Sequence, residues 1–196
     1  MRSRFIVLEG PDGAGTTLHS RLLAESLQSL TVDIVLTKEP TDGPIGQTIR
    51  QELGKGTMPA AALQMLFCAD RAWHNEVVVE PALSEGKTVI SDRYALSTIV
   101  YGTALGLDPL WLSELNKKFI QPDCQILLLP SFETSNQRVS SRPVKDMLET
   151  NELQRSVYDA YVDYSRKHPA LLCVDTAGSK EEVAKKILDT VLHLSS

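Results

Sequence analysis

GPDGAGTT, residues 10–17, follows the short apolar run Phe5–Glu9 and precedes a segment with leucines at helical spacing. It matches the phosphate-loop pattern G-x-x-x-x-G-K-[ST] at three of its four fixed positions and departs from it at Thr16, where the pattern has lysine. Small residues in a strand–loop–helix context let backbone N–H groups converge on a phosphate, and the helix N-terminus adds a positive partial charge. The stretch therefore predicts a site for nucleotide phosphates at the end of a buried strand.

Every residue of this phosphate loop is a candidate contact for ATP, and two have a further role. The hydroxyl of Thr17 is suited to ligate Mg²⁺, and the carboxylate of Asp12 is expected to face the reacting phosphates. Because Thr16 carries no charge, either another cation substitutes for the lysine or phosphoryl transfer is slow. A plain glycine-rich turn is the alternative interpretation of the segment alone. The predicted ATP contacts are Gly10, Pro11, Asp12, Gly13, Ala14, Gly15, Thr16 and Thr17.

Apolar runs alternate with helical stretches along the chain. Several runs are continuous in apolar residues, which is typical of strands buried on both faces of a parallel sheet. This order predicts a doubly wound α/β fold, and 196 residues suit one domain, residues 1–196. The predicted strands are Phe5–Glu9, Val32–Thr37, Thr88–Ser91, Gln125–Leu129 and Leu171–Asp175. The predicted helical regions are Thr17–Leu30, Pro59–Glu85, Pro109–Phe119, Glu152–Lys167 and Ser179–Leu194.

Net charge and composition limit which binding partners and which cellular compartment we expect for the protein. The net charge of −5 argues against general nucleic-acid binding, so positive charge must be concentrated where phosphates bind. No apolar run approaches the roughly 20 residues that cross a bilayer. The N-terminal run is too short for a signal sequence, so we expect a cytoplasmic protein with no membrane partner. Cys68, Cys124 and Cys173 are isolated in the sequence and are expected to be buried, reduced thiols.

A cation and a carboxylate follow the second predicted strand. Lys38 and Glu39 stand at its carboxyl end, and Arg50 follows a helical turn beyond Gly46. Ligands of open parallel sheets bind at this edge, so these side chains are candidate substrate contacts. A solvated turn is the alternative interpretation.

The long helical region carries an aromatic ring and a guanidinium on one face. Phe67 and Arg71 are four residues apart, which brings their side chains together on a helix. A phenyl ring stacks on a nucleobase, and a guanidinium donates to an acceptor on the base edge. The pair therefore suits a nucleobase. The alternative is a core phenylalanine beside a surface ion pair of Arg71 with Asp70 or Glu76.

The third predicted strand runs into Asp92-Arg93-Tyr94. Asp92 stands where phosphoryl-transfer proteins with a phosphate loop keep a carboxylate for Mg²⁺, and Arg93 is able to clamp a phosphate with two hydrogen bonds. Ser97 and Tyr101 follow, and the ring of Tyr101 would fill the space of a 2′-hydroxyl and favour deoxyribose. A structural ion pair between Asp92 and Arg93 is the alternative.

A basic segment follows the fourth predicted strand. Arg138, Arg142 and Lys145 fall within eight residues, with serines and a proline between them. A flexible basic segment is what a phosphoryl-transfer lid needs, because the lid must close over the phosphates and exclude water. We predict a mobile lid near residues 138–150 whose arginines neutralise the transferring group. A solvated basic loop is the alternative.

Taken in order, these segments resemble thymidylate kinases of the nucleoside monophosphate kinase group over nearly the whole chain. The strongest match is D-R-Y-x-x-S-x-x-x-Y from residue 92, together with F-x-A-x-R from residue 67, and K-E-P from residue 38 resembles the family's R-E-P. The resemblance implies a five-stranded parallel sheet, a homodimer, and transfer of a phosphoryl group from ATP to dTMP. It also implies that Phe67 and Arg71 hold thymine, that Arg50 and Arg93 hold the acceptor phosphate, and that the lid arginines stabilise the transferring group.

Three positions depart from the family pattern, and each removes charge near the phosphates. They are Thr16, Pro130 in place of an aspartate after the fourth strand, and Met147 in place of a lid arginine. We expect Mg²⁺-dependent formation of dTDP from ATP and dTMP by direct in-line transfer. A weak or inactive nucleotide-binding homologue, or a kinase for another (deoxy)nucleoside or monophosphate, remains open. The predicted catalytic residues are Asp12, Arg93, Arg138 and Arg142; the substrate contacts are Lys38, Glu39, Arg50, Phe67, Arg71, Arg93, Ser97 and Tyr101; the metal ligands are Thr17 and Asp92.

Overall fold

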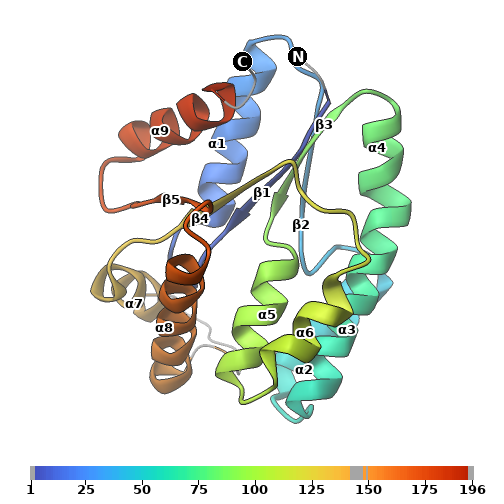
Figure 1. Ribbon diagram of the computed structural model, residues 1–196, viewed down its shortest axis with the longest axis vertical. Coiled ribbons are helices and arrows are strands. Elements are labelled where there is room, and N and C mark those ends of the chain that lie inside the picture. Colours follow the sequence, from blue (N-terminus) through green and yellow to red (C-terminus); the bar gives the residue numbers. More distant parts are fainter. Residues whose placement is uncertain (1–2, 142–147, 149, 194–196) are drawn as a thin grey trace.

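A computed structural model describes residues 3–141, 148 and 150–193 of the chain (Figure 1). Five strands form one sheet in the order β2-β3-β1-β4-β5, and all neighbouring strands are parallel. The predicted doubly wound α/β fold is therefore confirmed, with each strand within two residues of its predicted bounds. The strands are β1 (Phe5–Glu9), β2 (Ile34–Lys38), β3 (Thr88–Asp92), β4 (Cys124–Leu128) and β5 (Leu172–Val174).

Helices connect and cover the strands. The predicted helical region 59–85 consists of three contiguous pieces, because a five-residue π-helical segment, η1, interrupts the α-helical hydrogen bonding. The helices are α1 (Thr16–Ser29), α2 (Pro44–Lys55), α3 (Ala60–His74), η1 (Asn75–Val79), α4 (Glu80–Ser84), α5 (Ala95–Ala104), α6 (Pro109–Asn116), α7 (Phe132–Ser140), α8 (Asn151–Lys167) and α9 (Lys180–His193).

Three of these helices, α2, α5 and α7, were not predicted as elements. Two of them carry end signals in the sequence. Helix α2 has Pro44 in its first turn and ends at Gly56 in a left-handed conformation. Helix α7 begins after Ser131, whose hydroxyl accepts from the backbone N–H of Thr134. Helix α5 starts directly after Asp92-Arg93-Tyr94 and carries the predicted site residues Ser97 and Tyr101.

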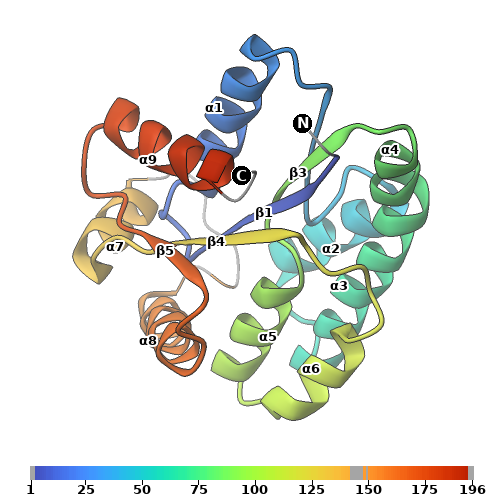
Figure 2. The ribbon, with the colours of Figure 1, turned by 45° about the horizontal axis from the view of Figure 1, so that its top comes forward.

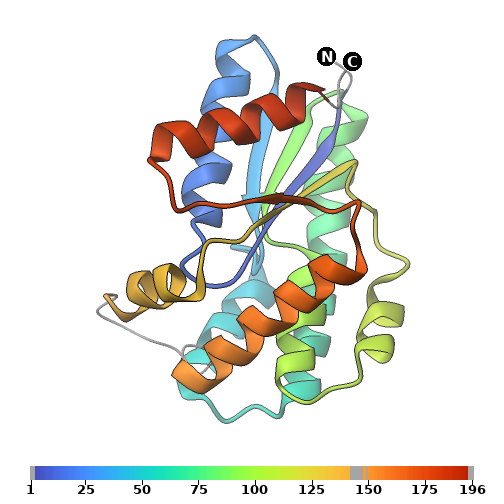
Figure 3. The ribbon, with the colours of Figure 1, turned by 60° about the vertical axis from the view of Figure 1, so that its left-hand side comes forward.

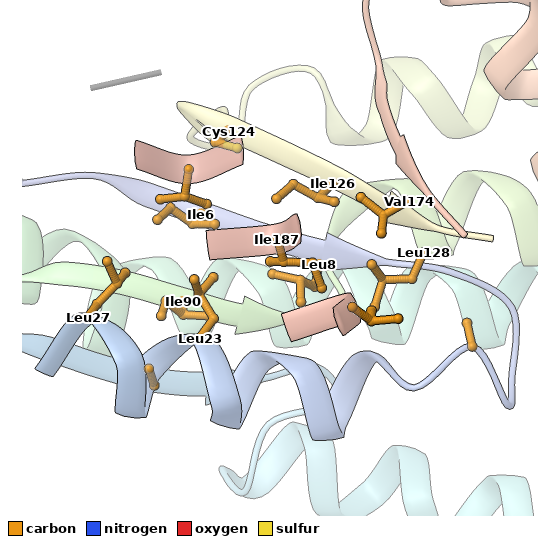
Figure 4. Packing of buried hydrophobic residues seen from close by; sticks show 14 residues of the cluster. Ile6, Leu8, Leu23, Leu27, Ile90, Cys124, Ile126, Leu128, Val174 and Ile187 are labelled. Carbon is orange, nitrogen blue, oxygen red and sulfur yellow. The ribbon is translucent and has the colours of Figure 1, made fainter. Parts of the chain in front are cut away.

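Strand residues alternate between the two faces of the sheet, and each face has its own apolar cluster. Figure 2 shows α1 and α9 on one side of the sheet and α3 and α4 on the other. Ile6 and Leu8 of β1 pack against Leu27 of α1 and Ile187 of α9 (Figure 4). The intervening residues of β1 pack on the opposite face, with Val79 at the end of η1. Because both faces are covered, every residue of β1 and β3 is buried, and apolar side chains predominate in β1.

The cysteine prediction was correct for two residues of three. All three thiols are reduced, and Cys68 and Cys124 are buried, but Cys173 is exposed. Cys173 lies on β5, a three-residue edge strand that is only partly covered. An apolar run at the edge of a sheet does not bury every side chain, which explains the error.

The carboxyl ends of the strands point towards a second group of helices. Helices α2, α3, α5 and α8 share an apolar cluster there that includes Leu63, Val100 and Val157. Figure 3 shows α8 lying beside α5 below the strand ends. This cluster forms the floor and walls of the functional region. Within the described residues, no helix is long and apolar enough to cross a membrane.

Candidate active site

The phosphate loop leaves the end of β1 and is held in shape by its glycines. Gly13 and Gly15 have φ angles of 81° and 93°, in the left-handed region that favours glycine. A Cβ atom on Gly13 would lie 2.4 Å from the carbonyl oxygen of Ser135, so α7 packs directly on the loop backbone. The predicted loop–helix junction is confirmed, since α1 starts at Thr16. The side chain of Thr16 is buried, with the residue only 6% exposed.

Thr17 and Asp92, the two predicted metal ligands, are in direct contact. The Thr17 hydroxyl donates to Asp92 Oδ2 at 2.5 Å. Asp92 Oδ1 is buried and has no hydrogen-bond partner among the residues that the structure describes. A hydroxyl beside a carboxylate with an unused buried oxygen fits the all-oxygen ligand set of Mg²⁺. Both residues line a depression, here called the side hollow, together with Ser20, Leu36, Thr37, Lys38 and Asp42.

A second cavity, here called the main pocket, opens beside the phosphate loop. It is enclosed by the loop, the exit of β2 and helices α3 and α5. Seven of the predicted site residues line it together, although they are spread over 90 positions of sequence. These seven are Asp12, Glu39, Phe67, Arg71, Arg93, Ser97 and Tyr101, and the remaining lining residues are Pro40, Leu53, Gln64, Tyr94, Thr98 and Leu148.

Arg71 is buried in the wall of the main pocket, at 1% exposure, and is fixed by several partners. Its Nη2 lies 2.5 Å from Oε2 of Glu39 and donates to the hydroxyl of Thr98 at 3.0 Å. Its Nη1 donates to Asn116 Oδ1. The alternative of a surface ion pair with Asp70 or Glu76 is wrong. Burial alone would lower the pKa of Arg71, but the neighbouring groups Glu39, Cys68 and Tyr94 together outweigh it, so the net effect raises this pKa.

Glu39 and its neighbours form the turn that closes this wall. The Glu39–Pro40 peptide bond is cis. Glu39 Oε1 also contacts Nδ1 of the buried His74 at 3.0 Å. Asp70 accepts from both the backbone N–H and the hydroxyl of Thr41, at 2.7 and 2.6 Å. Asp70 on α3 and Glu39 directly after β2 therefore tie the strand exit to the helix.

Arg93 joins the main pocket to the phosphate loop. It has a φ of 71°, an uncommon conformation for a residue other than glycine, which tends to occur at functional sites. Its guanidinium donates to the carbonyl oxygen of Gly10 at 2.7 Å, to Asp12 Oδ1 at 2.6 Å and to Ser97 Oγ at 3.2 Å. It also lies 5.5 Å from the centre of the Tyr101 ring. The structural ion pair expected as an alternative, with Asp92, is replaced by a pair with Asp12.

Glu9 is a functional-region residue that the sequence analysis did not single out. Its buried carboxylate accepts from the backbone N–H groups of Tyr94 and Ser97 at 2.9 and 3.3 Å, and from Ser97 Oγ at 2.6 Å. The hydroxyl of Tyr161 donates to it at 3.4 Å. Burial raises the pKa of Glu9, although Ser97 and Arg93 oppose the shift. A carboxylate ending an otherwise apolar strand was the available signal.

Arg138, the first of the predicted lid arginines, lies against the phosphate loop. Its guanidinium donates to the carbonyl oxygen of Gly13 at 3.1 Å and to that of Thr176 at 2.9 Å. Burial lowers the pKa of His19 on α1, and the nearby charge of Arg138 lowers it further. The other predicted lid cations, Arg142 and Lys145, lie outside the described residues, so the lid near 138–150 stays a prediction.

Two predicted substrate contacts do not line the main pocket. Lys38 lines the side hollow, where its Nζ lies 3.1 Å from Asp42 Oδ1. Arg50 donates to the carbonyl oxygens of Pro40 and Thr41 at 2.9 and 2.6 Å and to Asp42 at 3.2 Å. Both side chains are partly exposed at the rim of the β2 exit. Their predicted roles as phosphate contacts remain proposals.

Comparisons with known proteins agree with this geometry. A family model described as thymidylate kinase matches residues 8–187. The chain is 41% identical over 195 residues to a probable thymidylate kinase of Thermococcus kodakarensis, covering 94% of this chain and 95% of that protein. A probable thymidylate kinase of Thermococcus onnurineus is 39% identical over 199 residues, 96% and 97% of the two chains. A thymidylate kinase of Nitrosospira multiformis is 35% identical over 196 residues, 95% and 96% of the two chains.

Proposed function

Because this chain belongs to the thymidylate kinase family, it phosphorylates dTMP with ATP, and we propose that transfer takes place between the phosphate loop and the main pocket. The relatives named as kinases favour catalysis over the binding-only interpretation. The observation that carries the assignment is the position of Arg93. Its guanidinium bonds Gly10 and Asp12 of the loop and lines the pocket that also contains Phe67 and Arg71.

The reaction needs positioning and charge neutralisation more than acid–base chemistry. An oxygen of the dTMP phosphate forms a bond to the γ-phosphorus of ATP, and the bond from that phosphorus to the bridging oxygen breaks, which releases ADP. The attacking oxygen is already ionised at neutral pH, so no general base is required. The protein has to hold two anions in line and supply positive charge between them.

We assign the donor side to the phosphate loop. The backbone N–H groups of residues 10–17 and the N-terminus of α1 are suited to the ATP phosphates. Thr17 and Asp92 would hold Mg²⁺, which neutralises phosphate charge when bound; their contact and the unused oxygen of Asp92 support this. Arg138 supplies positive charge next to Gly13, which supports its role towards the nucleotide.

We assign the acceptor side to the main pocket. Phe67 would stack on the base and Arg71 would donate to its edge; that both line this pocket supports these roles. Tyr101 also lines the pocket and would exclude a 2′-hydroxyl, while Arg93 joins Ser97 to Gly10 of the loop. Glu39 contributes by holding Arg71. Lys38 and Arg50 at the rim are proposed to attract the acceptor phosphate.

Because Thr16 stands where a phosphate loop usually has lysine, other residues must supply the positive charge near the phosphates. Two guanidinium groups already bond the loop backbone, Arg93 at Gly10 and Arg138 at Gly13. Lys38 lies in the side hollow next to Thr17. We propose that these cations together replace the missing charge, with the lid arginine Arg142 and Lys145 as further candidates.

Compartment and assembly are part of the same proposal. We propose a cytoplasmic homodimer that acts on free nucleotides and binds neither nucleic acid nor membrane. The net charge of −5 and local concentration of cations around the phosphate loop support a small anionic substrate. Met65 and Val77, apolar side chains that are 55% and 53% exposed on α3 and η1, support a subunit contact on that helix.

A coupled assay of ADP release tests the function. Purified protein with saturating Mg-ATP is offered dTMP, dUMP, dCMP, AMP and thymidine separately. We expect the highest kcat/KM with dTMP and little turnover of thymidine, because an in-line acceptor phosphate is missing there. Turnover of dTMP no faster than ATP hydrolysis without an acceptor would contradict the assignment.

A further inference from the structure

The main pocket contains a side chain whose hydrogen-bonding capacity the protein does not use. Gln64 lies on α3, is fully buried at 0% exposure, and lines the pocket. Within residues 3–141, 148 and 150–193, neither its amide oxygen nor its amide nitrogen has a hydrogen-bond partner. A buried amide without partners destabilises a fold. Packing alone therefore gives no reason for glutamine rather than leucine or methionine at this position.

Gln64 shares its helix face with the two residues assigned to the base. Gln64, Phe67 and Arg71 are spaced i, i+3 and i+7, and all three line the main pocket. The neighbouring helix α5 approaches closely at Gly102, where a Cβ atom would lie 3.3 Å from Gln64 Cγ and 2.6 Å from Leu112 Cδ1. The glycine thus gives the glutamine stem its space, and the stem is held between α5 and the pocket.

The charged side chains that α3 and the exit of β2 present to the pocket are already engaged or unsuited to accept a hydrogen bond. Arg71 has only donors, and its two terminal nitrogens contact Asn116, Glu39 and Thr98, which leaves Nε without a partner among the described residues. The carboxylate of Glu39 contacts both Arg71 and His74. On this wall Gln64 therefore offers both a donor and an acceptor that remain available to a ligand.

We propose that Gln64 recognises the N3–H edge of the pyrimidine base of the acceptor nucleotide. Its Oε1 accepts from N3–H, and its Nε2 donates to the adjacent ring carbonyl. A 2,4-dioxopyrimidine presents this donor–acceptor pair, and a carboxamide matches it with two hydrogen bonds. This inference rests on the proposed function, because it concerns the same acceptor site, and it makes Gln64 a specificity-determining residue rather than a catalytic one.

Calorimetry of dTMP binding to the wild-type protein and to Gln64→Leu tests the proposal. Leucine is similar in size and removes an amide that is unpartnered in the ligand-free protein, so we expect an equal or higher melting temperature. We expect the Kd of dTMP to rise roughly 5- to 150-fold, the range for loss of a bidentate amide–base pair. In turnover, KM should rise with little change in kcat, because the base contact is the same before and during transfer. Gln64→Met, which keeps the unbranched stem, is the second variant if leucine impairs folding.

The matched control is Met65→Leu, the next residue of α3, which is 55% exposed and does not line the main pocket. It should leave the Kd of dTMP unchanged. dUMP shares the N3–H edge and lacks only the methyl group, so Gln64→Leu should weaken dUMP and dTMP by the same factor. A loss confined to dTMP would overturn the proposal, because it would mean that Gln64 senses the methyl group.

The failures of the two proposals are distinguishable. If the wild-type protein binds no dTMP and does not phosphorylate it, both the function and the role of Gln64 are wrong. If the wild-type protein binds and phosphorylates dTMP, and folded Gln64→Leu and Gln64→Met bind it equally tightly, the function stands and the role of Gln64 is wrong.

Discussion

The replacement Glu39→Gln should strongly destabilise the protein, because it leaves the charge of Arg71 buried without its counter-charge. The two side chains are 1% and 3% exposed, and their closest N–O distance is 2.5 Å. Removing one partner of a buried ion pair costs ~3–5 kcal/mol, since the remaining charge keeps its desolvation penalty. For a chain of this size each kcal/mol lowers the melting temperature by ~2–4 °C, so we expect a fall of roughly 6–20 °C. Thr98 and Asn116 still contact Arg71 in the variant, but neither supplies negative charge.

Thermal unfolding followed by circular dichroism measures the effect, with Asp42→Asn as the matched control. Asp42 lies three residues further on and pairs with Lys38 and Arg50, but its side chain is 79% exposed. Exposed pairs contribute ~0–1 kcal/mol, so the control should melt within a few degrees of the wild type. The double change Glu39→Gln with Arg71→Met should recover part of the loss, because no buried charge remains. Equal melting temperatures for Glu39→Gln and Asp42→Asn would refute the reasoning.

Three further changes test other parts of the site. Burial raises the folded-state pKa of Glu9 above its ordinary value of 4.5. The stability that this shift contributes is therefore fully present below pH 4.5 and is lost as pH rises through the raised pKa. The free energy of unfolding of Glu9→Gln minus that of the wild type should therefore grow as pH rises above 4.5, and a difference that stays flat in denaturant titrations contradicts this. Thr16→Lys should leave kcat unchanged or lower it, because it adds a cation at a position that is only 6% exposed, in a loop to which Arg93 and Arg138 already donate hydrogen bonds. A tenfold rise in steady-state kcat would instead show that the wild-type loop lacks positive charge. Asp92→Asn should raise the Mg²⁺ concentration for half-maximal rate by roughly tenfold or more, and an unchanged Mg²⁺ titration would remove Asp92 from the metal site.

The fold was predictable because its main signals are local. The first four residues of the run Phe5–Glu9 are all apolar, since both faces of the sheet are covered, and this property needs no knowledge of the partner strands. The strand ends were less accurate, because pairing decides them. Lys38 belongs to β2 because it lies in register with Asp92 on β3, a contact between residues far apart in the sequence.

In the candidate site, too, features set by neighbouring residues were predictable, and features set by contacts between distant residues were not. The i, i+4 spacing of Phe67 and Arg71 brings both into one pocket, as predicted. The partner of Arg71 is Glu39, 32 residues away, whereas a reading of neighbouring residues suggested Asp70 or Glu76. Gln64 gave no signal in the sequence, because only the packing of α5 on α3 shows that its amide is buried and unpartnered.

Transfer of a labelled γ-phosphate from ATP to dTMP most directly tests whether the phosphate loop and the main pocket form one kinase site. Wild-type protein and Arg93→Met are incubated with labelled ATP, Mg²⁺ and dTMP, and dTDP is identified by chromatography. We predict labelled dTDP from the wild-type protein and a rate ~100-fold lower from the variant, the usual cost of losing one group that stabilises transition-state charge. Label that appears only as inorganic phosphate, or equal rates of dTDP formation by the two proteins, would contradict the site proposed here.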